Sequence, residues 1–177
     1  MTDQPTQAEI DAVLTPEVRS WVGQMSEPIA LPEPVSASDL RRYINATGDR
    51  NPLWLDDEFA KMVGYKARIL PPMMVIDLSW RLQEGEDGRL WHHNIPLPPN
   101  YIDTRNAENE IEWLGEVYVG ETLVLTHRVI DIVARGGRRG LGVYITRETE
   151  FRTVDGRIVA RLRQTVVRFP KAAVRAG

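Results

Sequence analysis

The chain has 177 residues, a formal net charge of −3, and 42% hydrophobic and 27% charged residues. This length suffices for one well-buried core rather than two independent domains, and the composition is that of a folded globular protein. Because there is no cysteine, disulfides, thiolate metal ligands and a cysteine nucleophile are excluded. No apolar run is long enough to span a bilayer and the polar start lacks a signal-peptide pattern, so we expect a cytoplasmic protein without a membrane partner.

Charge is distributed unevenly along the chain. From His127 to the end there are twelve Lys or Arg against four Asp or Glu, whereas the preceding part has ten against twenty-one. The basic part could hold the phosphates of a coenzyme or of a nucleic acid. Arginines that alternate on the solvent-facing side of strands would give the same count. We favour that interpretation and expect no nucleic-acid partner.

The pattern predicts an N-terminal extension over residues 1–35, one domain over 36–170 and a tail over 171–177. In the extension, a polar lead precedes a short helix that begins at Thr15-Pro16. Prolines 28, 32 and 34 allow only a short edge strand or an extended linker after it.

Three helices are expected next. The first is capped by Ser36 and Asp39, has an apolar face and ends at Gly48. The second is capped by Asp56 and Asp57 and ends at Gly64; its expected buried residues are Phe59, Met62 and Val63. The third begins at Pro71-Pro72 and runs to about Glu84. It is apolar nearly all round, which predicts burial on several sides.

Residues 88–106 read as a long ordered loop, of the kind that is often functional. The remainder is β-like, with strands expected at Glu110–Tyr118, Glu121–Val133, Leu141–Val154 and Ile158–Phe169. Glycine-containing turns at residues 119–120, 136–137 and 155–156 separate them. A buried helix followed by a four-stranded antiparallel meander predicts an α+β hot-dog fold, in which the sheet wraps around a long central helix. A generic α+β sandwich is the alternative.

Residues 43–54 (YINATGDRNPLW) resemble the signature of the MaoC-like (R)-specific enoyl-CoA hydratases and dehydratases. The family pattern Gly-Asp-x-Asn-Pro-Leu-His is matched by Gly48, Asp49, Asn51, Pro52 and Leu53. Residues 67–74 are similar to the stretch that opens the central helix in the N-terminal-type branch of that family. The likeness extends over about residues 36–169.

The resemblance implies addition of water to the double bond of an acyl thioester of coenzyme A or of an acyl-carrier protein, with no cofactor. This reaction needs a base for the water proton, an acid for the α-carbon and donors near the thioester oxygen. In the family an Asp and a His flank the water and an Asn orders the loop. Carried over, Asp49 and Asn51 are the candidate catalytic residues.

The sequence departs from the family at Trp54, which stands where the histidine is expected. An indole N–H donates a hydrogen bond but does not transfer a proton. The resemblance therefore implies the histidine-lacking half of a hydratase, as a homodimer or as a heterodimer with a His-bearing MaoC-like chain. The candidate substrate-binding residues are Trp54, Pro71, Pro72, Met73 and His93.

Other interpretations stay open. His92, His93 or His127 could replace the missing histidine, although His127 fits a packed position on a strand face with Leu125 and Val129. None of the three has metal-ligand spacing, so no metal is expected. The chain could also be a non-catalytic acyl-CoA-binding or structural subunit. A hot-dog thioesterase that uses Asp77, a carboxylate in an apolar helix, is a further alternative.

Overall fold

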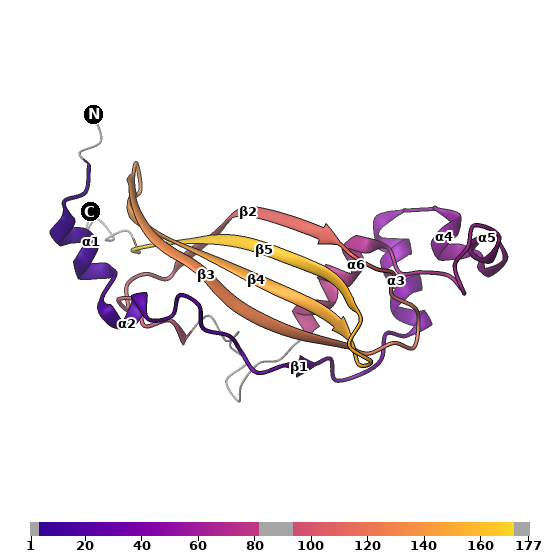
Figure 1. The fold of residues 1–177 in the computed structure, drawn as a ribbon. Helices are drawn as coiled ribbons and strands as arrows, with labels where there is room; N and C mark the ends of the chain where they lie inside the picture. The colour runs from indigo at the N-terminus through magenta and orange to yellow at the C-terminus, as the bar shows by residue number, and fades with distance from the viewer. Residues whose placement is uncertain (1–3, 82–93, 172–177) are drawn as a thin grey trace.

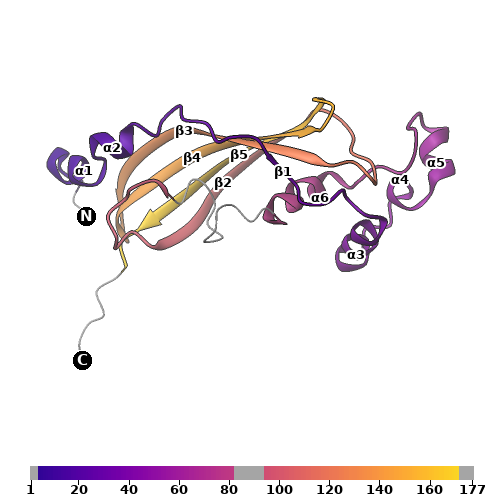
Figure 2. The same cartoon turned by 90° about the horizontal axis from the view of Figure 1, so that it is seen from below.

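The computed structural model describes residues 4–81 and 94–171. Its centre is a five-stranded antiparallel sheet in the order β1-β3-β4-β5-β2. The strands are β1 (Ile29–Ala30), β2 (Asp103–Trp113), β3 (Leu123–Gly137), β4 (Gly140–Thr153) and β5 (Ile158–Phe169). Helix α6 (Pro72–Asp77) lies against one face of the sheet and continues as the 3-10 turn η1 (Leu78–Arg81) (Figures 1 and 2).

The other helices gather at the two ends of the sheet (Figure 1). Helices α1 (Gln7–Val13) and α2 (Pro16–Arg19) lie at one end, and α3 (Ala37–Thr47), α4 (Pro52–Leu55) and α5 (Asp57–Met62) lie at the other. Each end has its own cluster of buried apolar side chains. One cluster joins Val13 and Val18 to the part of β3–β5 towards the β3–β4 turn. The other joins Leu40, Trp54 and Met74 to the part of the same strands towards the β4–β5 turn.

Local capping signals were read correctly from the sequence. The Ser36 side chain accepts from the backbone N–H of Asp39 at the start of α3, and Asp39 accepts in return. The helix ends at Gly48, whose φ of 70° is left-handed and favours glycine. Thr15 caps α2 and Asp56 caps α5, as predicted.

Two predictions about the short helices were wrong. The expected polar lead is partly helical, because Thr6 and Glu9 form a capping box that begins α1. Helix α5 buries Ala60, whereas Met62 and Val63 are 73% and 48% exposed. It is too short and too far from the sheet to bury a full face (Figure 1).

The central helix is also shorter than predicted. Its α-helical part ends at Asp77, where the 3-10 turn begins, and the Ser79 hydroxyl donates back to the carbonyl of Ile76 at 2.7 Å. Such a side-chain bond to the preceding turn competes with regular helix geometry. The predicted end near Glu84 lies outside the described residues. Met74, Val75 and Ile76 are buried, but Met73 is 53% exposed and Asp77 is exposed, so the helix is not covered all round.

The sheet order corrects the predicted meander. Strand β2 begins inside the expected loop and pairs with β5, not with β3. Residues 114–122 cross to β3, which is longer than a tight hairpin. On the way Val117 and Tyr118 are buried, and the Val117 carbonyl accepts from the N–H of Leu70 at 2.8 Å. This connection packs beside the entry to α6 and leaves β2 at the sheet edge.

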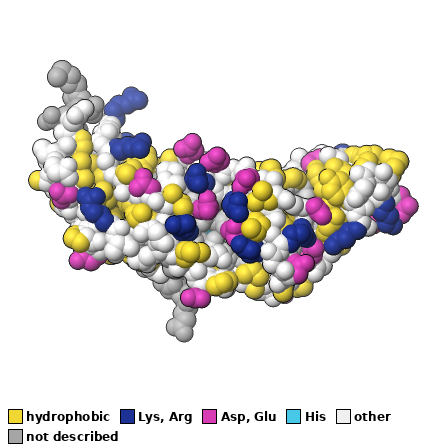
Figure 3. Space-filling model, viewed as in Figure 1, with side chains coloured by type: hydrophobic (Ala, Val, Ile, Leu, Met, Phe, Trp, Pro, Cys, Tyr) yellow, Lys and Arg dark blue, Asp and Glu magenta, His cyan; other side chains and the backbone are white. Residues whose placement is uncertain are grey.

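The uneven charge along the sequence is balanced in space. Arg161 bridges Glu112 and Glu150 at 3.2 and 3.0 Å, and Arg163 contacts Glu148 at 3.2 Å. The members on β4 and β5 alternate with buried side chains, and Figure 3 shows basic and acidic groups interspersed over the face in view. The strand arginines in these contacts are therefore part of a solvated ion-pair ladder. In the part of the chain described here, no helix combines the length and apolarity needed to cross a membrane.

Candidate functional site

The family-like motif forms a tight turn between α3 and α4. The Asp49 Oδ1 accepts from the N–H of Asn51 at 3.0 Å, and the Asn51 Oδ1 accepts from the N–H of Leu53 at 3.0 Å. Asn51 is thus the N-cap of α4, with Pro52 at the first helical position. Asn51 thus stabilises the start of α4 through its side chain.

Trp54 contacts Asp49 directly. Its indole Nε1–H donates to Oδ2 of Asp49 at 2.9 Å, while the ring is 7% exposed and packs in the main core. Both carboxylate oxygens of Asp49 therefore accept a hydrogen bond, one from backbone and one from indole. The carboxylate itself is exposed. The indole N–H of Trp54 donates a hydrogen bond but does not transfer a proton.

Asp49 shares its surroundings with a second carboxylate. Burial raises the pKa of Tyr43, and the negative charges of Asp77 and Asp49 raise it further. The phenol on α3 is therefore within electrostatic range of both carboxylates and stays neutral at physiological pH. Asp77 is exposed rather than enclosed in a pocket, in agreement with a wet stripe on α6.

The candidate binding residues at the start of α6 differ in how far they are exposed to solvent. Pro71 is buried at the N-cap and Pro72 is exposed at the first helical position. Met73 is half-exposed and borders a cavity between α6 and the sheet. His93 lies outside the described residues, as does His92. Among the described residues, no three His, Cys, Asp or Glu side chains gather in a way that could hold a metal ion.

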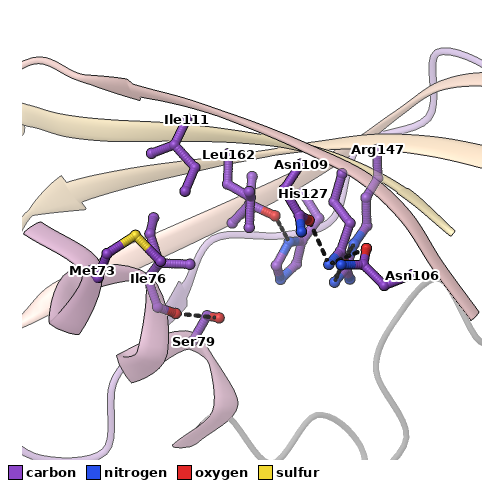
Figure 4. Close-up of a pocket in the computed structure, with 11 residues that line it drawn as sticks. Met73, Ile76, Ser79, Asn106, Asn109, Ile111, His127, Arg147 and Leu162 are labelled. Atoms are coloured by element: carbon purple, nitrogen blue, oxygen red, sulfur yellow. Dashed lines mark hydrogen bonds between the residues drawn. The ribbon is translucent and has the colours of Figure 1, made fainter. Parts of the chain in front are cut away.

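A band of polar side chains crosses the sheet face beneath α6 (Figure 4). We call it the polar belt; its members are Asn109 of β2, Gln164 of β5, Arg147 and Thr149 of β4 and His127 of β3. Gln164 Oε1 accepts from Arg147 Nη2 at 2.6 Å, and Gln164 Nε2 donates to Asn109 Oδ1 at 3.0 Å. Nδ1 of His127 lies 2.8 Å from Oγ1 of Thr149.

The polar belt forms one wall of a cavity of about 180 Å³. The remaining lining residues are Met73, Ile76, Ser79, Asn106, Ile111 and Leu162. Of the belt, only His127 was singled out from the sequence, as a packed residue on the face of Leu125 and Val129. It is 4% exposed, which confirms its position.

A sequence signal for the other belt members exists in the strand alternation. The inward positions of β4 are Val143, Ile145, Arg147, Thr149 and Phe151, so two polar residues interrupt an apolar series. The inward residues of β5 show the same interruption at Gln164. These interruptions on separate strands form one polar cluster in the folded sheet, where Arg147 lies opposite Gln164.

The model of the FAS1-like dehydratase domain region matches residues 20–162. A probable enoyl-CoA hydratase alpha subunit of Thermomonospora curvata is 26% identical over 163 residues, covering 86% of this chain. The chain spans only half of that relative's length.

Solved structures share the fold. A chain of the ChsH1-ChsH2 complex from Mycobacterium tuberculosis superposes with a TM-score of 0.71 at 21% identity, with 90% of each chain covered. The (R)-hydratase from A. caviae superposes with a TM-score of 0.58 at 20% identity, over 84% of this chain and 96% of that one. The hot-dog architecture is thereby confirmed. Because the family model covers most of the chain, this protein belongs to the FAS1-like, MaoC-related dehydratase family.

Proposed function

We propose that the chain is one subunit of an (R)-specific 2-enoyl-CoA hydratase/3-hydroxyacyl-CoA dehydratase. The observation that carries this proposal is the Asp49–Trp54 contact within an otherwise family-like turn. Family membership and the alpha-subunit relative support the hydratase role. A cytoplasmic location and a place in fatty-acid metabolism belong to the same proposal.

The chemistry explains why a second chain is needed. During hydration the water oxygen bonds to the β-carbon, one water proton leaves to a base, and a proton is added to the α-carbon. Asp49 can hold the first proton, with Asn51 ordering its loop. Trp54 occupies the place of the acid and has no transferable proton at neutral pH. We infer that a His-bearing partner supplies the complete acid–base pair and that Trp54, Pro71, Pro72 and Met73 help to bind the thioester.

Strand β2 is the proposed contact with that partner. It is the outer strand beside β5, and nearly all its residues are exposed. An edge strand presents unpaired N–H and C=O groups that a second chain can extend. Trp113 at its end is 41% exposed and is followed by Leu114 at 44%. A solved relative of this fold is itself a complex of two named chains.

The test is an assay with crotonyl-CoA, which loses its enoyl absorbance on hydration. The chain is measured alone, with a MaoC-like chain that has an intact Asp…His pair, and that chain is also measured alone. We expect little activity from this chain alone and a gain of at least tenfold in the mixture over the partner by itself. Equal rates for the mixture and the partner would contradict a functional pairing and favour a structural subunit.

Two variants identify the residues involved. In the mixture, Asp49→Asn should leave complex formation unchanged and shows whether its carboxylate contributes to the rate. Release of free thiol without loss of the enoyl absorbance would instead indicate a thioesterase, and Asp77→Asn would then abolish that release.

A further inference from the structure

The polar belt interrupts the series of buried apolar side chains on β3, β4 and β5. On β3, His127 stands between Leu125 and Val129, both 0% exposed. On β4, the belt residues Arg147 and Thr149 lie between Ile145 and Phe151, which are both 0% exposed. The two apolar clusters of the protein lie on either side of this level. The belt therefore separates two regions in which apolar side chains fill the same face.

Stability does not explain polar side chains at this level. Burying polar groups is unfavourable unless they are hydrogen-bonded, and a satisfied pair contributes little more than an apolar pair of the same shape. Gln164 is 8% exposed beside the inward Leu162 of the same strand, and Thr149 is 2% exposed beside the inward Phe151, so both stand next to buried apolar residues. A role in binding a polar group accounts for belt residues from four strands at one cavity.

The cavity has room for part of a ligand. Its volume of about 180 Å³ is similar to that of an engineered protein cavity of about 150 Å³ that admits benzene. Met73, Ile76 and Leu162 give it an apolar side, and the belt gives it a hydrogen-bonding side (Figure 4). Amide, hydroxyl and imidazole groups together offer both donors and acceptors. A hydrocarbon stem with an oxygen substituent matches this combination.

Helix α6 joins the cavity to the candidate site. Met73 borders the cavity, and the negative charges of Asp77, one turn later on the helix, and of Asp49 both add to the effect of burial in raising the pKa of Tyr43. We propose that the cavity receives the acyl part of the thioester and that the preferred acyl chains carry a hydroxyl or keto oxygen. The inference rests on the proposed function and adds the substrate class to it.

Calorimetric titration of the full chain tests this with matched ligands. Hex-2-enoyl-CoA and oct-2-enoyl-CoA are compared with analogues in which a hydroxyl replaces the terminal methyl, so that size is kept and only polarity changes. We expect one of the hydroxylated analogues to bind at least about tenfold more tightly than its hydrocarbon counterpart, which is the effect of one well-placed hydrogen bond.

Two near-isosteric variants assign the preference to the belt. Thr149→Val removes the hydroxyl 2.8 Å from His127, and Gln164→Leu removes the amide between Arg147 and Asn109. The matched control is Thr146→Val, on the same strand but facing the opposite side, where its hydroxyl lies 2.9 Å from that of Thr165. The preference should fall below about threefold in either belt variant and persist in the control.

Different failures have different meanings. If every thioester binds but hydroxylated and hydrocarbon chains bind equally, the substrate class is wrong and the proposed function stands. If the preference survives in both belt variants, the cavity is not its source and the inference is overturned. If no thioester binds at all, the proposed function itself is contradicted and the inference falls with it. Circular dichroism of each variant verifies that it is folded, and either belt variant alone suffices for the test.

Discussion

The indole N–H of Trp54 donates to Oδ2 of Asp49 at 2.9 Å, where the resembled family has an acid–base pair. The contact joins a buried ring in the core to an exposed carboxylate on the turn. The contact therefore connects the turn to the core, next to a candidate substrate-binding residue. Its contribution to the stability of the fold can be measured.

Trp54→Phe keeps an aromatic ring in the core but removes the N–H donor and part of the ring volume. We expect the free energy of unfolding to fall by about 2 kcal/mol, from the lost hydrogen bond to a charged group and a small cavity. Urea denaturation measures this. The control is Trp113→Phe on the exposed edge of β2, which should change stability by less than about 0.5 kcal/mol. Equal losses in the two variants would show that the indole contact is not the cause.

Asp57 predicts a pH effect at the junction between α5 and the segment before α6. The backbone N–H of Arg68 donates to Oδ1 of Asp57 at 2.9 Å and, with the nearby guanidinium of Arg68, lowers the pKa of Asp57. A depressed folded-state pKa gives stability that is present above the unfolded pKa of about 3.9 and is lost as pH falls through the folded value. Asp57→Asn should remove this contribution.

The measurement is thermal unfolding of wild type and Asp57→Asn between pH 6 and pH 3. The stability gap between them should be constant at the higher pH values and close as the pH falls below about 3.9. Glu58→Gln on the same turn is the control, because the Glu58 side chain is 85% exposed and its ion pair with Lys61, at 2.9 Å, lies on the surface of the helix. A gap that stays constant down to pH 3 would contradict the assignment.

Trp113 tests the proposed partner surface. Trp113→Glu replaces an exposed apolar side chain at the end of β2 by a charged one, so it should weaken association with the partner at least tenfold. Analytical ultracentrifugation of the mixture measures the dissociation constant. Val154→Glu, 71% exposed at the β4–β5 turn, is a matched substitution that should leave the constant unchanged. An unaffected complex in Trp113→Glu would place the interface elsewhere.

Gly142 predicts a packing effect in the sheet. A methyl group there would lie 2.7 Å from Cε1 of Phe169 and 3.0 Å from Cγ2 of Val167, so Gly142→Ala requires both side chains to move. We expect a loss of about 1–2 kcal/mol in the free energy of unfolding, as for overpacked cores. Gly137→Ala, where a methyl group meets nothing within 4 Å, should change stability much less. Equal losses of stability in the two variants would mean that the Phe169 side chain moves aside without cost, which would contradict the prediction.

The sequence by itself determined the features that depend on neighbouring residues. The caps at Ser36 and Gly48, the Asp49–Asn51 turn and the strand Ile158–Phe169 all follow from local hydrogen bonding and alternation. The motif also identified the family and the missing histidine.

Only the tertiary structure decided that β2 lies beside β5. Gln164 and Asn109 are 55 residues apart on strands that no turn joins, so no local pattern places them together. The position of β2 beside β5 depends on the packing of residues 114–122 near α6, not on the turn signal within them. The indole of Trp54 likewise reaches Asp49 because the core holds its ring. Thus local propensities determined the turn, and long-range packing determined the cavity beneath α6.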